Sequence, residues 1–197
     1  MKTIRLVAWA GVAVAGLALL ALLALAPGRF GVSQPPFAAT VGGPFRLVSQ
    51  DGAVVTDKTL AGKPFAIFFG FTNCPDVCPT SMLELSETMK ELGSDADRMR
   101  FLFVSVDHEH DTGRHLKEYL SNFDTRITGL TGTAAEIAAA ARAYRVYYEK
   151  VKTKEGYTYN HTATIYMMDS KGRLAGTIAY QEDAKSRLAK LRRLADM

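Results

Sequence analysis

The sequence is poor in cysteine, with two residues in a chain of 197. Two cysteines are too few for a disulfide-stapled secreted scaffold, which carries four or more. The composition also lacks the low hydrophobicity of a disordered chain, because 48% of the residues are hydrophobic and 22% are charged. The length suits one domain of ordinary size and leaves little room for a second.

The body of the chain lacks an excess of positive charge. The whole sequence has 24 Lys and Arg against 20 Asp and Glu, a formal net charge of +4. Three of the basic residues (Lys2, Arg5 and Arg29) lie in the first 29 residues, which hold no acidic residue, and setting them aside leaves 21 basic against 20 acidic residues. A nearly neutral body argues against a nucleic-acid-binding surface.

One long hydrophobic run is present near the N-terminus. Residues 6–26 carry no charge and, as a helix of 21 residues, would span about 31 Å, the thickness of a hydrocarbon core. A cleaved signal peptide is the alternative, with a small-residue site at 24–26, but the run is longer than the apolar part of most signal peptides. We therefore predict a retained transmembrane anchor over residues 1–29.

The charges around this run predict its orientation. Lys2 and Arg5 precede it, so the positive-inside rule places the N-terminus in the cytoplasm and the body outside. The few residues before the run leave no room for an organellar transit peptide. We predict a single-pass protein of a bacterial inner membrane with its C-terminal domain in the periplasm.

The rest of the chain alternates between strand and helix patterns after a linker predicted over residues 30–44, which is rich in Pro and Gly. The domain predicted over 45–197 begins with a hairpin whose turn lies at Asp51-Gly52, and a second hairpin with its turn at Asp169-Ser-Lys-Gly172 precedes a closing helix. Buried strands are expected at 65–71 and 100–106, a short strand at 127–130 and hairpin strands at 162–168 and 174–179, with helices at 79–92, 112–123, 133–144 and 183–195. This order predicts an α/β fold of thioredoxin-like arrangement, a central sheet with helices on both faces.

Both cysteines lie where the first buried strand leads into a helix. They form the motif Cys74-Pro-Asp-Val-Cys78. The N-terminus of a helix exposes unpaired backbone N–H groups and the positive end of the helix dipole, which favour the thiolate. A structural disulfide would close only a small loop and add little stability. The pair therefore indicates redox chemistry, metal binding or both, and two buried structural thiols are the weaker alternative.

His161 is the histidine that the expected fold brings toward this pair. It precedes the predicted strand 162–168, and in a thioredoxin-like sheet that connection lies beside the cysteine loop. Two thiolates and one imidazole suit copper, because soft sulfur selects Cu(I) and imidazole also accepts Cu(II). The same set resembles a zinc site that lacks one ligand. A histidine hydrogen-bonded within its loop is the simpler alternative.

A second group of polar residues, Asp107-His108-Glu109-His110-Asp111, follows the strand 100–106. We interpret it as a polar loop in which Asp111 or Thr112 caps the next helix. Metal binding by His108 and His110 is the alternative. His115 is expected on the solvated face of that helix.

These residues and motifs together resemble the Sco/SenC family of copper-binding, thioredoxin-like proteins. The resemblance covers residues 44–180 and is carried by the strand FAIFFGF, which runs into TNCPDVCP, by FVSVD with its acidic loop ending in DT, and by the later histidine. It implies that Cys74, Cys78 and His161 are copper ligands and that Asp76 tunes the site. The family usually has Pro and Arg at the positions of His108 and His110, so an auxiliary copper contact there is a hypothesis specific to this chain.

The resemblance implies a membrane-anchored copper metallochaperone, which delivers copper, reduces the cysteines of its target or does both, and which is not expected to be a turnover enzyme. Its expected partner is the copper-bearing subunit of cytochrome c oxidase, whose binuclear copper centre it would help assemble, or another copper chaperone. The alternative is a thiol–disulfide oxidoreductase that uses Cys74 and Cys78 and carries no copper. A peroxidase is disfavoured, because Pro75 stands where the peroxidatic motif needs Thr.

Overall fold

The structure, a computed structural model, describes residues 40–154 and 156–197. The predicted anchor (1–29) and most of the predicted linker lie outside these residues. In the part of the chain that is described, no helix is long and apolar enough to cross a bilayer. The folded domain starts earlier than residue 45, because Val41 packs against the core and the Gly42 N–H donates to the Ala143 carbonyl at 2.9 Å.

The central sheet has seven strands in the order β2-β1-β5-β4-β3-β8-β9. At its middle, β3 pairs in parallel with β4 and antiparallel with β8, so the sheet is mixed. The predicted hairpins form its two edges, β1·β2 and β8·β9. The strands are β1 (Arg46–Ser49), β2 (Val54–Thr56), β3 (Phe65–Gly70), β4 (Arg100–Ser105), β5 (Ile127–Thr131), β8 (Thr164–Met168) and β9 (Leu174–Ala179).

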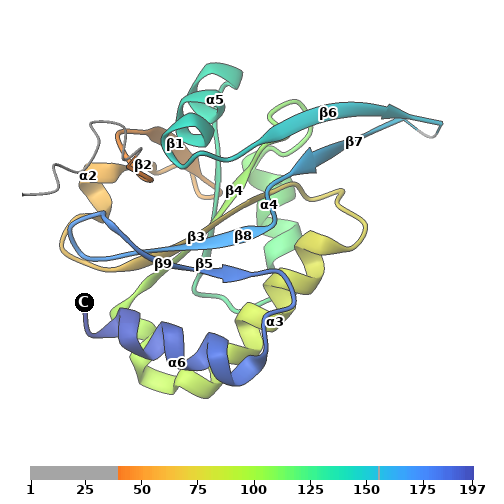
Figure 1. Cartoon of the computed structure of the whole chain (residues 1–197). Coiled ribbons are helices and arrows are strands. Elements are labelled where there is room, and N and C mark those ends of the chain that lie inside the picture. Colours follow the sequence, from red (N-terminus) through yellow and green to blue (C-terminus); the bar gives the residue numbers. More distant parts are fainter. Residues whose placement is uncertain (1–39, 155) are drawn as a thin grey trace, which may run out of the picture. The chain divides into compact units, whose positions relative to one another are not determined.

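Helices cover both faces of this sheet, as predicted. Figure 1 shows α3 and α6 side by side on one face and α5 on the other. A capping box begins α5, since Thr133 and Glu136 each accept the other's backbone N–H. The helices are α2 (Asp57–Leu60), α3 (Val77–Leu92), α4 (Gly113–Leu120), α5 (Ala134–Ala143) and α6 (Ala184–Ala195), and a 3-10 helix, η1, covers Gly93–Arg98.

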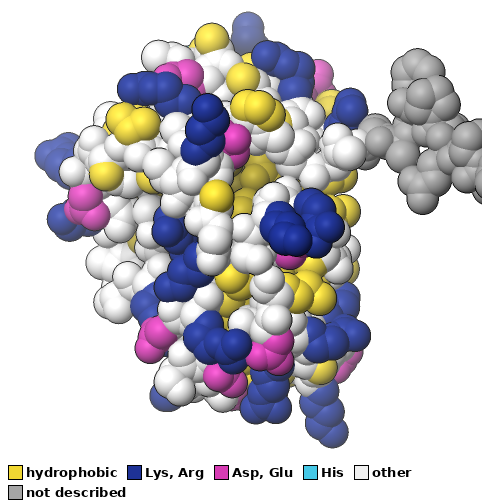
Figure 2. Space-filling view, turned by 90° about the vertical axis from the view of Figure 1, so that its left-hand side faces the viewer, with side chains coloured by type: hydrophobic (Ala, Val, Ile, Leu, Met, Phe, Trp, Pro, Cys, Tyr) yellow, Lys and Arg dark blue, Asp and Glu magenta, His cyan; other side chains and the backbone are white. Residues whose placement is uncertain are grey.

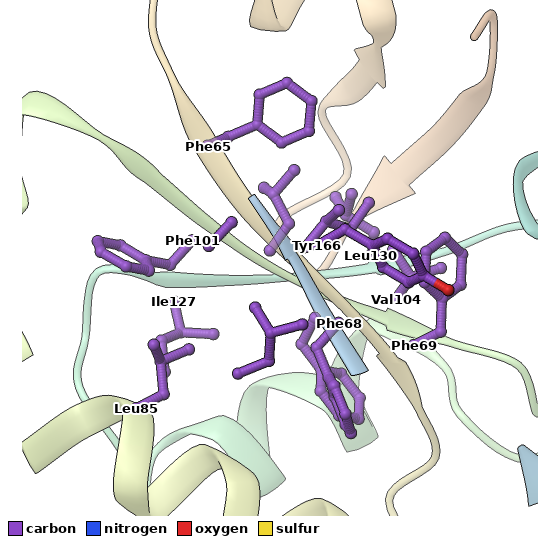
Figure 3. Packing of buried hydrophobic residues seen from close by; sticks show 14 of the residues in the cluster. Phe65, Phe68, Phe69, Leu85, Phe101, Val104, Ile127, Leu130 and Tyr166 are labelled. Atoms are coloured by element: carbon purple, nitrogen blue, oxygen red, sulfur yellow. The ribbon is translucent and has the colours of Figure 1, made fainter. Parts of the chain in front are cut away.

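The core is built around β3, all six residues of which are buried. Neighbouring side chains of this strand point to opposite faces. Phe68 packs against Phe103 on one face and Phe69 against Tyr144 on the other, and Figure 3 shows the two rings among the aliphatic side chains of the adjoining strands. A strand fixed on both sides holds its carboxyl end rigidly, and the cysteine motif begins there.

A second, two-stranded sheet was not predicted. It consists of β6 (Tyr148–Thr153) and β7 (Gly156–His161), which pair antiparallel. In Figure 1 this hairpin projects from the body of the domain on the right. The sequence prediction placed His161 after a loop, which is wrong: His161 is the last residue of a strand.

The charges on the end of the domain opposite the hairpin are mixed. Figure 2 views this end, the left side of Figure 1, and shows Lys and Arg side chains interspersed with Asp and Glu around small apolar areas. No histidine is visible among the described residues of this face. The pattern agrees with the nearly neutral body expected from the sequence.

Candidate metal centre

The two cysteines lie on the turn between β3 and α3. Helix α3 begins at Val77, two residues earlier than predicted, so Cys78 lies in its first turn and Cys74 in the turn before it. Cys78 is fully buried, whereas Cys74 is half-buried. The Cys78 backbone N–H donates to Cys74 Sγ at 3.3 Å. The start of the helix thus supplies a hydrogen bond to the more accessible sulfur.

The position of Cys78 depends on a glycine in β3. A Cβ atom added to Gly70 would lie 2.7 Å from Cys78 Sγ and 3.0 Å from a ring carbon of Phe68. Real Cβ atoms do not approach sulfur so closely, so only glycine allows the thiol to pack directly on the strand. This close approach directs Cys78 inward, toward the ring of His161.

His161 reaches the cysteines from the end of β7. Its Nε2 lies 3.4 Å from Cys78 Sγ, and its Nδ1 lies 3.2 Å from the Thr162 carbonyl oxygen. In the tautomer that donates Nδ1–H to this carbonyl, the Nε2 lone pair faces the sulfur, as metal binding requires. Phe68 and Phe71 meet the imidazole edge-on, at centroid distances of 6.0 and 5.7 Å. The histidine is therefore oriented before any ion binds.

The structure brings the three predicted ligands together. One ligand atom from each of Cys74, Cys78 and His161 lies within 4.8 Å of the other two. A surface hollow of about 270 Å³ opens beside Cys74 and His161, lined partly by Phe71 and Tyr159. No fourth Cys, His, Asp or Glu joins this group within the described ranges. Two sulfurs and one nitrogen suit copper, and they leave a structural zinc site one ligand short.

The two thiols have opposite acidities. The hydrogen bond with Cys78 lowers the pKa of Cys74 to about 4, with further help from His161 and from the backbone amides of Cys78 and Asp76. Burial raises the pKa of Cys78, and the neighbouring charge of Cys74 raises it further. At neutral pH the pair therefore holds one accessible thiolate beside one buried thiol, the arrangement of a nucleophile and its resolving partner.

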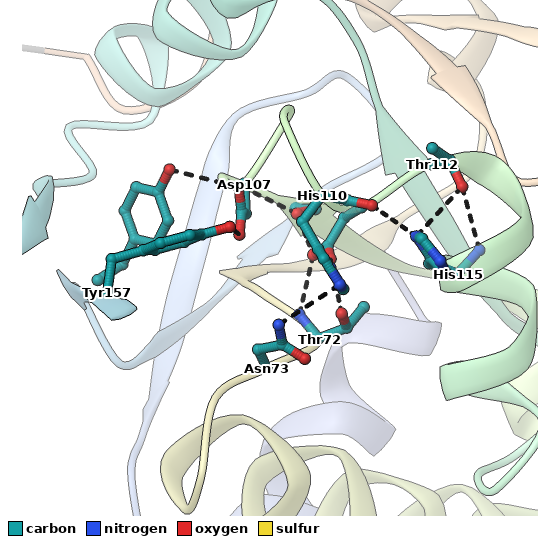
Figure 4. Close-up of polar contacts among 10 residues, drawn as sticks. Thr72, Asn73, Asp107, His110, Thr112, His115 and Tyr157 are labelled. Atoms are coloured by element: carbon teal, nitrogen blue, oxygen red, sulfur yellow. Dashed lines mark hydrogen bonds and ion pairs between the residues drawn. The ribbon is translucent and has the colours of Figure 1, made fainter. Parts of the chain in front are cut away.

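The buried carboxylate of Asp111 ties the cysteine turn to the acidic loop, because it contacts both Thr72 and His110, which are labelled in Figure 4. Asp111 is 1% exposed and accepts hydrogen bonds from the Thr72 backbone N–H at 2.8 Å and from the Thr72 hydroxyl at 2.6 Å. The Ser105 hydroxyl donates to the same carboxylate at 2.5 Å. Asp111 and Thr112 were the two residues predicted as possible caps of the next helix. Thr112 is the cap of α4. Asp111 instead holds Thr72, at the start of the cysteine turn.

Asp107, which is fully buried, anchors the β6·β7 hairpin. The hydroxyls of Tyr157 and Tyr159 donate to its two oxygens at 2.8 and 3.4 Å. Because His161 ends the same strand, these bonds help to hold the predicted nitrogen ligand. Neither tyrosine was predicted to support the site, although aromatic residues at alternate positions directly after Gly156 are typical of a strand that follows a turn.

The remaining candidates lie around the site without joining the sulfur–imidazole group. His110 Nδ1 lies 2.9 Å from an Asp111 oxygen, and with Asp107 these residues form a second cluster of ligand atoms. His108 is exposed and is not part of that cluster. The auxiliary copper contact by His108 and His110 stays a prediction.

Two further residues differ from expectation in detail. His115 is half-buried rather than solvated, because its ring stacks on that of His110 at a centroid distance of 4.7 Å. The exposed side chain of Asp76 accepts only a 3.3 Å hydrogen bond from Thr80, and its link to the site is its backbone amide, which lowers the Cys74 pKa.

The chain is similar in sequence and in fold to several known proteins. The copper-bound structure of ScoI from Bradyrhizobium japonicum is 50% identical, with a TM-score of 0.74 over 78% of this chain and 99% of that one. Protein SCO1 homolog 1, mitochondrial, from Arabidopsis thaliana is 41% identical over 133 residues, 66% of this chain and 40% of its own length. The chain spans about half the length of the curated relatives it matches first.

A more distant structure shares the fold. BsSco, described as having a disulfide switch and as a member of the Sco family of cytochrome c oxidase assembly proteins, is 22% identical with a TM-score of 0.63, over 81% of this chain and 96% of that one. The SCO1/SenC family profile matches residues 33–196, nearly all of the chain beyond the predicted anchor. The chain belongs to the SCO1/SenC family.

Proposed function

We propose that Cys74, Cys78 and His161 bind one copper ion as cargo. The observation that carries this proposal is the convergence of two sulfurs and one oriented imidazole nitrogen, whose ligand atoms all lie within 4.8 Å. Copper accepts this ligand set in either oxidation state. The half-buried Cys74 leaves one side of the site accessible, as transfer to another protein requires.

The destination we propose for the copper is the binuclear copper centre of cytochrome c oxidase. Membership of the SCO1/SenC family supports this assignment. We further propose that residues 1–29 anchor the chain in a bacterial inner membrane with the domain in the periplasm. The charge pattern around the apolar run supports that orientation.

Anaerobic titration of the full-length chain with Cu(I) and Cu(II) tests the copper site. We expect one copper per chain and, for Cu(II), a sulfur-to-copper charge-transfer band. Cys74→Ser, Cys78→Ser and His161→Ala should each weaken binding at least about tenfold, since each removes one of three ligands. His115→Ala is the matched control, because it removes an imidazole outside the sulfur–imidazole group. Copper retained at full affinity by His161→Ala would contradict the three-ligand site.

Reduction of a disulfide in the target protein is a second candidate function, favoured by the unequal acidity of the two thiols. The Cys74 thiolate would attack one sulfur of the target disulfide and release the other as a thiolate. Cys78 would then lose its proton and attack Cys74 Sγ, which frees the second target sulfur. Two electrons pass from the pair to the target, and the pair ends as a disulfide.

Copper binding and disulfide formation exclude each other in this scheme, because copper needs both sulfurs as thiolates. The two activities are separated by His161→Ala, which should abolish tight copper binding and leave disulfide reduction largely intact. The reductase proposal fails if a Cys78→Ser variant traps no mixed disulfide with a target whose copper-site cysteines are oxidised.

A further inference from the structure

A continuous groove runs between the cysteine turn and strand β7. The hollow beside Cys74 and His161 adjoins a second one of about 470 Å³, and both are lined by Pro75 and Thr158. The second hollow continues to Lys154 at the far end of the hairpin. The groove therefore follows β7 along its length and passes the more accessible sulfur.

The backbone of β7 presents an open edge to this groove. In an antiparallel pair, alternate residues direct their N–H and C=O toward the partner strand, and the residues between them direct these groups away. The Thr162 N–H donates to the Tyr147 carbonyl at 3.0 Å, which fixes the phase of this alternation. With the register His161↔Tyr148, it follows that Thr158 and Asn160 bond to β6.

The outward-directed residues are Tyr157, Tyr159 and His161. Strand β7 pairs only with β6 in the described sheets, and no other backbone hydrogen bond from these three residues occurs in the described part of the chain. An unpaired edge is a template for another strand. Two residues of this edge, Tyr159 and His161, line the hollow that contains Cys74.

The groove is also polarised in charge. Lys154 lines one end and the exposed Asp76 the other. An extended segment with an acidic residue near Lys154 would complement this end, and it would run along the groove in one direction.

We propose that the groove binds an extended, cysteine-bearing segment of a partner protein as an added β-strand on the edge of β7. The strand's main-chain groups would pair with the outward amides and carbonyls of Tyr157 and Tyr159, and its cysteine would lie beside Cys74. This inference rests on the proposed function, since it describes how a protein that donates or accepts copper, or is reduced, engages the same site.

A tethered peptide tests the proposal without copper. The probe is a short synthetic peptide of alternating valine and threonine with a central cysteine and an acidic residue at one end, activated as its 2-thiopyridyl disulfide. In full-length Cys78→Ser, the Cys74 thiolate attacks the peptide sulfur and expels 2-thiopyridone, so the peptide stays attached through one disulfide. A matched peptide with N-methylated backbone amides attaches in the same way but cannot pair as a strand.

Amide hydrogen exchange, read by NMR, distinguishes the two complexes. We expect the unmethylated peptide to slow exchange of the Tyr157 and Tyr159 amides about fivefold or more, the scale of one backbone hydrogen bond. Thr158 and Asn160, already paired to β6, should change little. Equal protection by both peptides, or an unprotected Tyr159 amide with the unmethylated one, would overturn the proposal.

A pair of variants gives a second test in the Cys78→Ser background. Tyr157→Ala and Tyr157→Pro both remove the ring, but only proline also removes the outward N–H, and at this position it spares the bonds to β6. Tyr157→Pro should form the mixed disulfide several-fold more slowly than Tyr157→Ala, and equal rates would count against strand addition. These tests use no copper. A negative result would therefore contradict strand addition without contradicting the copper site, and negative copper titrations would not change how these tests are interpreted.

Discussion

Gly70 and Cys78 are in direct contact, and a Cβ on Gly70 would lie 2.7 Å from the Cys78 sulfur. Gly70→Ala should therefore displace Cys78 and lower the free energy of unfolding by about 1–3 kcal/mol, the usual cost of overpacking. Urea denaturation measures the change. In a Cys78→Ala background the same substitution should cost less, because the sulfur is gone. An unchanged cost in that background would mean that Phe68 and Phe103, not Cys78, limit the space.

The acidity of Cys74 predicts selective labelling. Since its pKa is lowered to about 4 and that of Cys78 is raised, iodoacetamide should modify Cys74 first. The thiolate fraction is nearly complete above the folded pKa, so the labelling rate should be flat from pH 6 to 8 and should fall as the pH drops toward 4. Mass spectrometry of digested protein measures the rate at each cysteine.

Loss of the groups that stabilise the thiolate should move this profile to higher pH. Cys78→Ala should raise the Cys74 pKa more than His161→Ala does, because the Cys78 hydrogen bond is the larger cause of the lowering. Equal labelling of both cysteines in the unmodified chain would show that the assigned acidities are wrong.

The carboxylate of Asp111 should contribute to stability through the cysteine turn. Asp111→Asn replaces an accepting oxygen with a donor among the buried Thr72 and Ser105 groups, so we expect a loss of about 1–3 kcal/mol. Exchange of the Thr72 amide should accelerate as well. Glu109→Gln is the control: it removes an exposed carboxylate of the same loop, paired only with Lys150, and should not measurably change stability. Equal changes in stability for Asp111→Asn and Glu109→Gln would show that the hydrogen bonds between Asp111 and Thr72 do not stabilise the domain.

The tyrosine–carboxylate bonds should control how firmly His161 is held. Tyr157→Phe removes the 2.8 Å bond to Asp107, so amides of β6 and β7 should exchange several-fold faster. Copper dissociation should also accelerate, while the labelling rate of Cys74 stays close to that of the unmodified chain. Tyr147→Phe serves for comparison, since that exposed hydroxyl bonds only to Glu149. Identical copper dissociation rates in the two variants would show that the Tyr157–Asp107 bond does not affect how long copper stays bound.

The sequence predicts the central fold and the sulfur pair well because both leave local signals. Apolar runs such as Phe65–Gly70 show buried strands, and a cysteine pair between a strand and a helix has few structural meanings. The β6·β7 hairpin escapes prediction because β6 is mostly exposed and rich in charge, so it lacks the alternation of a half-buried strand. The roles of Asp107 and Asp111 escape it as well, because their hydrogen-bond donors lie far away in the chain.

The three ligands come from two different sheets. Both cysteines follow β3 of the large sheet, whereas His161 ends a strand of the small one. The small sheet is held partly by two phenol hydroxyls on one carboxylate. Local opening of the hairpin would thus lower the coordination number from three to two while the core stays folded. In the proposed complex a partner strand pairs with this hairpin, so it would act on the nitrogen ligand while both sulfurs stay on the large sheet.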